Sequence, residues 1–95
     1  MEFNFEDKGD YIEVTISGRI DVKSSQDLSS KGDEVFKFGK KVVFEMSGVQ
    51  YVSSAGIRVF MRWVKIKRDF DMKSVREDVK QVFELTGIDE FLNFV

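Results

Sequence analysis

The segment that decides the fold is Tyr51–Phe60, with the sequence YVSSAGIRVF. It follows an apolar strand candidate at residues 42–46, and it opens a long helical pattern. Two adjacent serines, Ser53 and Ser54, therefore lie where a strand ends and a helix begins. The first turn of a helix carries backbone N–H groups without intrahelical partners and the positive end of the helix dipole. Such a position suits a phosphate, either as a bound ligand or as a modification of a serine.

The residues before this segment predict a hairpin and a helix. Phe3 and Phe5 alternate with polar residues, a turn follows at 7–10, and apolar residues alternate again up to Ile20. This period of two is typical of a sheet with one face in water, so we expect a hairpin over 3–20. A weaker helical pattern follows from Ser24 to Phe38, although Gly32 within it costs about 1 kcal/mol relative to alanine.

The strand before the serines differs from the hairpin strands. Lys41–Met46 is apolar on both faces apart from Glu45. This composition predicts a central strand that is covered on both sides or nearly so. The helix after the serines carries a first apolar stripe with helical spacing: Ile57, Phe60, Met61 and Val64.

The last third of the chain predicts a short strand and a further helix. Phe70 and Met72 alternate with polar neighbours, and Ser74 then has the spacing of a capping box with Glu77. Gly87 suits the left-handed residue just past a helix end. We expect residues 89–95 to form one helical turn that closes the domain.

This order of elements predicts an α/β fold in a single domain, residues 1–95. The mixed sheet has about four strands, of which the first is antiparallel, and the later crossovers are right-handed. Because the second strand has one polar face, the helices are expected to pack mainly on one face of the sheet.

The amino-acid composition limits the classes of function that the chain can have. The chain has 95 residues, a net charge of −2, no cysteine and no histidine. The missing residue types remove thiolate chemistry, the commonest general base and the commonest metal ligand, so we expect no enzyme, no metal and no cofactor. No apolar run approaches the ~20 residues of a membrane span, and no basic block suggests nucleic acid. A cytoplasmic protein without a membrane or nucleic-acid partner is the expectation.

Four segments in order resemble one family: Gly18–Asp21, Val43–Val49, Tyr51–Ile57 and Val79–Ile88. They resemble, respectively, the end of the second strand, the third strand with its turn, the signature loop and the last long helix of a STAS domain. The likeness is to STAS domains of bacterial anti-sigma-factor antagonists, and it covers nearly the whole chain.

The resemblance implies a switch at one serine. In that family, the serine that starts the second helix is phosphorylated by a partner that is both a serine kinase and an anti-sigma factor. The unmodified protein binds that partner and frees the sigma factor. Ser54 matches the phosphorylated serine, with Ser53 as the alternative, although many members have aspartate at the Ser53 position. Asp21 matches an acidic residue beside the phosphorylation loop. A serine phosphatase is a further implied partner, and a monomer or weak dimer is expected.

The residues also suggest where a partner would dock. Gly56 and Arg58 lie near the candidate phosphorylation site, and Arg58 is one turn beyond Ser54. A second apolar stripe (Val59, Trp63 and Ile66) is turned away from the first, and tryptophan and arginine are enriched at binding hot spots. The predicted partner-binding residues are Ser53, Ser54, Arg58, Val59, Arg62, Trp63 and Ile66.

Several alternatives stay open. The two serines can be a simple N-cap, Asp21 can cap the first helix, Gly56 can serve close packing, and Trp63 can belong to the core. A second function keeps the fold without the switch, as a constitutive accessory subunit on a transporter ATPase or a signalling scaffold. A third is a small module that binds a nucleotide or anion at the helix start.

Overall fold

Four strands form one mixed sheet in the order β1-β2-β3-β4. The computed structural model describes residues 1–95. The strands are β1 (Glu2–Asp7), β2 (Tyr11–Ile20), β3 (Lys41–Val52) and β4 (Phe70–Lys73), and the helices are α1 (Val22–Phe36), α2 (Ser54–Lys65), α3 (Glu77–Thr86) and the 3-10 helix η1 (Ile88–Phe91). β1 is antiparallel to β2, whereas β3 is parallel to both β2 and β4. The predicted fold class and hairpin are confirmed.

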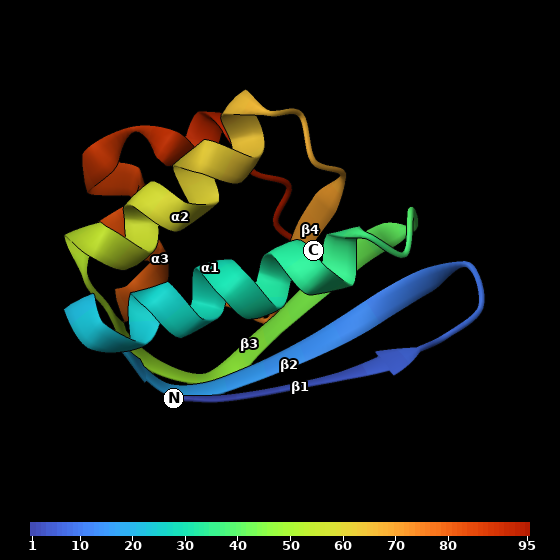
Figure 1. The fold of residues 1–95 in the computed structure, drawn as a ribbon. Coiled ribbons are helices and arrows are strands. Elements are labelled where there is room, and N and C mark those ends of the chain that lie inside the picture. Colours follow the sequence, from blue (N-terminus) through green and yellow to red (C-terminus); the bar gives the residue numbers. More distant parts are fainter.

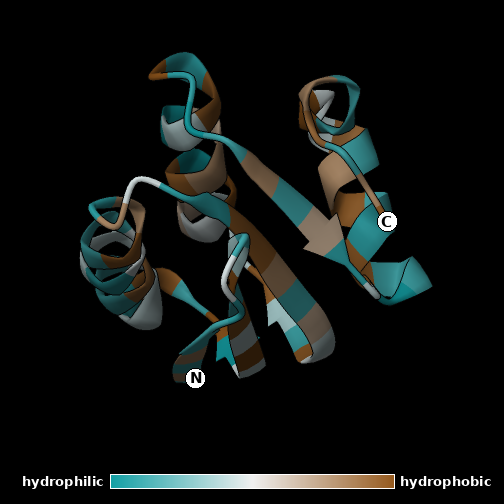
Figure 2. Ribbon diagram, turned by 90° about the vertical axis from the view of Figure 1, so that its right-hand side faces the viewer, coloured by the Kyte–Doolittle hydropathy of each residue, from teal (hydrophilic) through white to brown (hydrophobic).

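All three α-helices pack on the same face of the sheet (Figure 1). Along β2, Ile12, Val14 and Ile16 are buried beneath the helices, and the residues between them are more exposed. Figure 2 shows this alternation as changes of hydropathy along the strand ribbons. β3 follows the same pattern, because Val43 and Glu45 on its other side are only partly buried. The prediction that both faces of the central strand are covered is therefore wrong: no helix packs on the second face.

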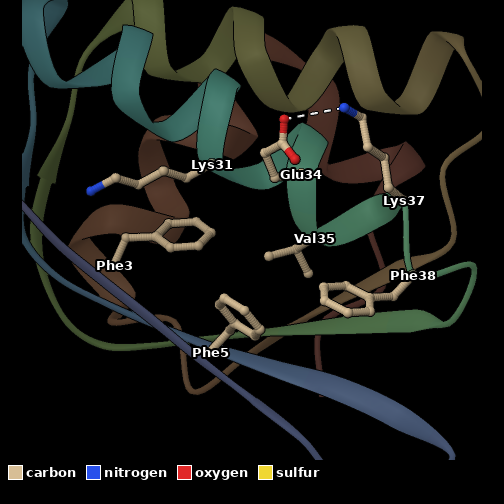
Figure 3. Close-up of a pocket in the computed structure, with 7 residues that line it drawn as sticks. All are labelled: Phe3, Phe5, Lys31, Glu34, Val35, Lys37 and Phe38. Atoms are coloured by element: carbon tan, nitrogen blue, oxygen red, sulfur yellow. Dashed lines mark hydrogen bonds and ion pairs between the residues drawn. The ribbon is translucent and has the colours of Figure 1, made fainter.

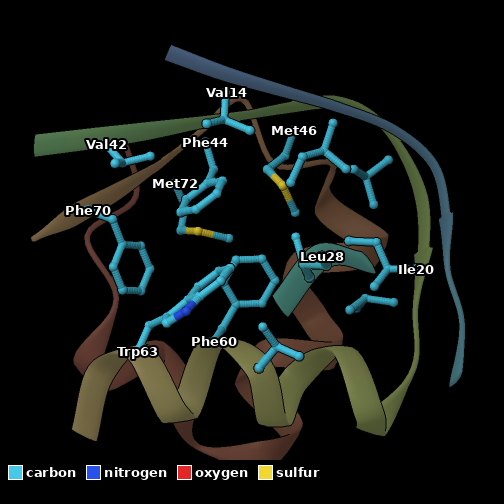
Figure 4. Close-up of a cluster of buried hydrophobic side chains, with 14 of the residues drawn as sticks. Val14, Ile20, Leu28, Val42, Phe44, Met46, Phe60, Trp63, Phe70 and Met72 are labelled. Atoms are coloured by element: carbon cyan, nitrogen blue, oxygen red, sulfur yellow. The ribbon is translucent and has the colours of Figure 1, made fainter. Parts of the chain in front are cut away.

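The core centres on aromatic rings between β3, β4 and α2 (Figure 4). The Trp63 ring stacks on Phe44 with centroids 5.3 Å apart, and Phe60 meets it edge-on at 5.4 Å. The α1 helix lies directly against Trp63, since a Cβ added at Gly32 would come within 2.3 Å of the Trp63 ring. The glycine that weakens the helical pattern of α1 is thus the residue that lets the tryptophan fit.

Several element boundaries differ from the predictions. α1 begins at Val22 rather than Ser24, and β3 continues to Val52 rather than ending at Met46. The longer β3 pairs with β2 through two register shifts. Irregular pairing of this kind leaves no periodic signal in the sequence.

Of the two helix caps predicted for α3, the one at its start is wrong and the one at its end is confirmed. α3 begins at Glu77 after Arg76, which makes no side-chain cap, so the predicted capping box at Ser74 is wrong. Ser74 instead adopts a left-handed conformation with φ of 56°. Gly87 ends α3 with φ of 78°, as predicted.

The last residues pair with the sheet. After η1, Phe94 forms an isolated parallel bridge with Met72 of β4. The Met72 amide donates to the Asn93 carbonyl and the Val95 amide donates to the Met72 carbonyl, both at 2.8 Å. The expected helical turn is therefore only the first part of this segment, and the rest covers the edge of β4.

Candidate functional site

The two serines at the start of α2 occupy different environments. Ser53 is the N-cap: its Oγ accepts from the Gly56 amide at 3.2 Å, and the residue is 6 % exposed. Ser54 is the first residue of the helix, is exposed, and its hydroxyl makes no hydrogen bond within the chain. The capping requirement is met by Ser53 alone, so the Ser54 hydroxyl is free for another role.

Two features fix the start of α2 on the sheet. The Ser53 amide donates to the Ile20 carbonyl at 2.7 Å, which ties the end of β3 to the end of β2. A Cβ added at Gly56 would lie 2.7 Å from Ile20 Cγ2 and 2.9 Å from Val52 Cγ2. The first turn of α2 therefore rests directly on the strand ends. The close-packing interpretation of Gly56 accounts for this geometry.

Asp21 starts the neighbouring helix α1. Its Oδ1 accepts from the Ser24 amide at 2.8 Å, and Ser24 Oγ accepts from the Asp21 amide at 2.9 Å, which completes a capping box. The Ser24 amide, with help from the Ser24 hydroxyl, holds the pKa of Asp21 below its ordinary value. Since Asp21 follows Ile20, to which Ser53 is hydrogen-bonded, the starts of α1 and α2 lie at the same end of the sheet. Asp21 itself makes no hydrogen bond to either serine of α2.

The same end of the sheet exposes residues that the sequence did not single out. The Arg19 guanidinium lies 4.2 Å from the centroid of the Tyr51 ring, and the two residues are partners in the β2–β3 ladder. Tyr51 is 39 % exposed, and Val22, next to Asp21, is 67 % exposed. Tyrosine and arginine are enriched at binding hot spots. The sequence feature that could have identified this pair is Tyr51, because it is an aromatic residue on the opposite side of the strand from buried Val52.

The predicted partner face of α2 is wrong for two residues. Trp63 is 0 % exposed and Val59 is 9 % exposed, so neither side chain is available to a docked partner in this fold. The reason is α1, which packs on that side of α2 and also supplies Asp33, whose Oδ1 accepts from the Trp63 indole N–H at 2.9 Å. Ile66 is 47 % exposed, but it lies at the C-terminal end of α2, the end remote from Ser54.

The two arginines of α2 also differ. The Arg62 guanidinium donates to Ser29 Oγ at 2.6 Å and to both carboxylate oxygens of Asp33 at 3.0 Å. Arg62 therefore fastens α2 to α1. Arg58 is exposed and forms no ion pair. It lies four residues after Ser54, and side chains at this spacing are neighbours on a helix surface.

No group of three or more acidic, histidine or cysteine side chains is placed to hold a metal ion. The larger hollow of the surface lies between β1 and α1 and does not include the start of α2. None of the helices has the length and apolar composition needed to cross a bilayer.

A family model described as "Mlab, STAS domain" matches residues 3–94. An anti-sigma factor antagonist from Mycobacterium paratuberculosis superposes with a TM-score of 0.87 at 20 % identity, over 98 % of this chain and 83 % of that one. A putative anti-sigma factor antagonist from Thermotoga maritima gives 0.83 at 19 % identity, over 97 % and 84 %. The Bacillus cell fate determinant SpoIIAA in its phosphorylated form gives 0.70 at 11 % identity, over 99 % and 91 %. At these identities, the likeness to solved structures is one of fold.

Proposed function

The chain belongs to the STAS domain family, and from that premise we propose that it is an anti-sigma-factor antagonist that switches partners through Ser54. In the unmodified state it binds an anti-sigma factor that is also a serine kinase. Phosphorylation of Ser54 by that partner releases it, and a serine phosphatase restores the binding state. Asp21 caps the start of α1. Gly56 lets the first turn of α2, which carries Ser54, pack closely on the ends of the strands.

The observation that carries the proposal is the division of roles between the two serines. Ser53 is buried and its Oγ already accepts the capping hydrogen bond from the Gly56 amide, whereas Ser54 is exposed and unbonded. A kinase therefore has access to Ser54 without opening the helix. Modification of Ser53, the alternative acceptor, would require the cap to break, which costs about 1 kcal/mol.

A phosphate at Ser54 is compatible with the fold. It would add about −1.5 to −2 charges at pH 7, placed at the positive end of the α2 dipole. Arg58, exposed and free of ion pairs one turn later, is the cation within helical reach. The domain itself is thus expected to stay folded after modification. The solved SpoIIAA structure in phosphorylated form supports this expectation, because it shares the fold.

The effect should fall on the partner instead. A dianion in a docked surface must lose its water, and an unpaired buried charge there costs roughly 2–5 kcal/mol. At about 1.4 kcal/mol per tenfold change, binding would weaken by tens to thousands of fold. That magnitude is sufficient for a switch without a change of shape.

We place the docking surface at the sheet end around Ser54 rather than along the whole of α2. Arg58 lies on its helix side, and exposed Val22 lies on the α1 side. Arg19 and Tyr51 supply a cation stacked on an aromatic ring. Substitution of Tyr51 by alanine is expected to weaken partner binding, whereas substitution of Ile66 at the far end of α2 should leave it unchanged.

Intact-mass measurement tests the proposal. The chain is incubated with ATP and each candidate kinase of the same genome, and one phosphate is expected on the wild type. Ser54→Ala should remain unmodified, while Ser53→Ala should still be phosphorylated. Equal phosphorylation of wild type and Ser54→Ala would overturn the assignment.

A second candidate is a constitutive accessory subunit that docks on a transporter ATPase or a signalling scaffold. The family model that matches is described as "Mlab, STAS domain" and not as an anti-sigma factor antagonist, and this description supports the second candidate. Ser54→Asp separates the two. A switch loses its partner when this charge is introduced, whereas an accessory subunit keeps its partner.

A further inference from the structure

An open apolar groove lies between β1 and α1, at the edge of the sheet away from β4 (Figure 3). It has a volume of about 570 Å³. Phe3, Phe5 and Phe38 face the same space, and Val35 forms its buried floor. Phe5 and Phe38 are 51 % and 54 % exposed although their ring centroids are 5.8 Å apart. Exposed aromatic side chains gathered in a concave site of this size are typical of a ligand pocket.

The charges at the groove are not balanced. Lys31, Glu34 and Lys37 of the α1 side line its rim. Glu34 is paired with Lys37 at 3.1 Å, while Lys31 stands apart from that pair and has no ion-pair partner. The acidic side chains of β1 do not offset this charge. Glu2 and Glu6 alternate with Phe3 and Phe5 and so point to the opposite face of the sheet. Asp7, on the same face as Phe3 and Phe5, is paired with Lys40 at 2.9 Å. The groove therefore combines an apolar body with one unpaired cation at its rim.

The shape of the groove favours a linear ligand. Its lining on the helix side extends from Lys31 to Phe38. The five helical steps from Lys31 to Phe36 rise about 7.5 Å, and Lys37 and Phe38 continue the lining in a hydrogen-bonded turn. The lining is therefore about 10 Å long, which is the extended length of roughly eight carbon–carbon bonds. We propose that this groove binds a free, single-chain fatty carboxylate of medium length. Its chain lies over the phenylalanines and its carboxylate pairs with Lys31.

A second copy of the chain is a poorer occupant. Two β1 edges joined antiparallel about Asn4 would set Glu2 of each copy directly opposite Glu6 of the other. Like charges in directly opposed positions destabilise a strand pair. In this register the charges of the β1 edge therefore disfavour a second copy, although the groove itself is apolar. The inference does not depend on Ser54, which lies outside the groove.

Titration with decanoate, followed by the amide NMR signals of the full chain, tests this proposal. We expect saturable one-to-one binding with shifts centred on β1 and the C-terminal half of α1. Lys31→Gln should weaken binding about threefold to fivefold, as for an exposed ion pair. Phe38→Ser should weaken it roughly tenfold. Decyltrimethylammonium, with the same chain and a cationic head, should bind more weakly than decanoate.

Matched controls keep the test specific. Lys23→Gln removes another exposed lysine of α1, and Phe91→Ser removes a phenylalanine that is 62 % exposed outside the groove. Both should leave decanoate affinity unchanged. Absence of saturable binding, equal affinity for the cationic amphiphile, or equal losses in the control variants would overturn the proposal. It would also be overturned if the chain bound anionic lipid vesicles but not free decanoate, or if sedimentation showed a stable dimer that covers the groove.

Discussion

At the residue scale, the candidate site depends on adjacent side chains with separate tasks. Ser53 caps α2, Ser54 presents a free hydroxyl, and Asp21 caps α1 at the same end of the sheet. The sequence was sufficient to point to this position, because a strand followed by two serines and a helical pattern is a local signal. The sequence was not sufficient to tell that Ser53 is the cap and that Ser54 is the exposed serine. Which serine faces the solvent depends on the hydrogen bond between the Ser53 amide and the Ile20 carbonyl, a contact between residues distant in sequence.

Asp21 gives the chain an acid-sensitive helix cap. Its pKa is lowered from the ordinary value of 3.8, chiefly by the hydrogen bond from the Ser24 amide. The contribution of the carboxylate to stability is therefore present above that ordinary value and is lost as the pH falls through the folded-state pKa. Asparagine caps helices about as well but does not titrate. We expect the wild type to lose unfolding free energy relative to Asp21→Asn on acidification, as measured by urea unfolding between about pH 3 and pH 7.

The control for this pH series is Asp27→Asn, which removes an exposed carboxylate of the same helix that makes no hydrogen bond. Its difference from wild type should vary less with pH. A constant difference for Asp21→Asn across the range would contradict the role given to the cap.

Gly56 is predicted to be intolerant of even one methyl group. Alanine would place its Cβ 2.7 Å from Ile20 Cγ2 and 2.9 Å from Val52 Cγ2, both on strands beneath the helix. Overpacking of this kind costs about 1–3 kcal/mol, in spite of the better helix propensity of alanine. Urea unfolding of Gly56→Ala measures the cost, and Ser54→Ala, two residues earlier on the exposed surface, should stay within about 0.5 kcal/mol of wild type. A more stable Gly56→Ala would show that the first turn of α2 does not rest on the strands.

At the scale of elements, the contact between α1 and α2 explains most of what sequence patterns missed. α2 is apolar on two sides, so its periodicity alone does not say which side meets the sheet and which meets a neighbour. The structure places Trp63 between the sheet and α1, where Gly32 makes room for the ring and Asp33 accepts its N–H. Tryptophan and glycine are thirty-one positions apart, so no local pattern links them. Strands and helices were predictable from periodicity, but this pairing was not.

A double-mutant cycle tests the contact. A Cβ at position 32 would meet Trp63 Cζ2 at 2.3 Å and Cη2 at 2.5 Å, atoms that phenylalanine lacks. Gly32→Ala and Trp63→Phe should each destabilise the chain. Their combination should cost less than the sum of the two by at least about 0.5 kcal/mol, because the smaller ring leaves room for the methyl group. Additive free energies of unfolding, or stabilisation by Gly32→Ala alone, would rule out this close approach.

At the scale of the whole molecule, the sheet is covered by helices on one face and closed at one edge by the end of the chain. The hairpin and the parallel order of β2, β3 and β4 follow from alternation and from the handedness of crossovers. The pairing of residues 93–95 with β4 was not predictable, because an isolated bridge has no periodicity. The prediction of a capping box at Ser74 was wrong because of the path of the chain after β4. The chain turns there in a left-handed conformation as it leaves β4, and α3 starts three residues later.

The C-terminal pairing is predicted to contribute to stability. Removal of residues 93–95 breaks two backbone hydrogen bonds with Met72 and the bond from the Asn93 amide group to Asp71. It also removes Phe94, whose ring lies 6.3 Å from that of Phe83. We expect a loss of about 2–4 kcal/mol in unfolding free energy from these contacts together. Phe91→Ser, a change at an exposed residue just before this segment, is the control, and an unchanged midpoint for the truncated chain would contradict the assignment.

Negative charge at Ser54 is expected to block a partner without disturbing the domain. The most direct measurement compares two homogeneous samples, one unmodified and one carrying phosphoserine at position 54, for affinity toward the anti-sigma factor kinase that modifies the chain. The dissociation constant is expected to rise by tens to thousands of fold, while the thermal unfolding midpoints of the two samples stay close together. Equal affinities of the two samples, or unfolding of the phosphorylated domain, would contradict the account.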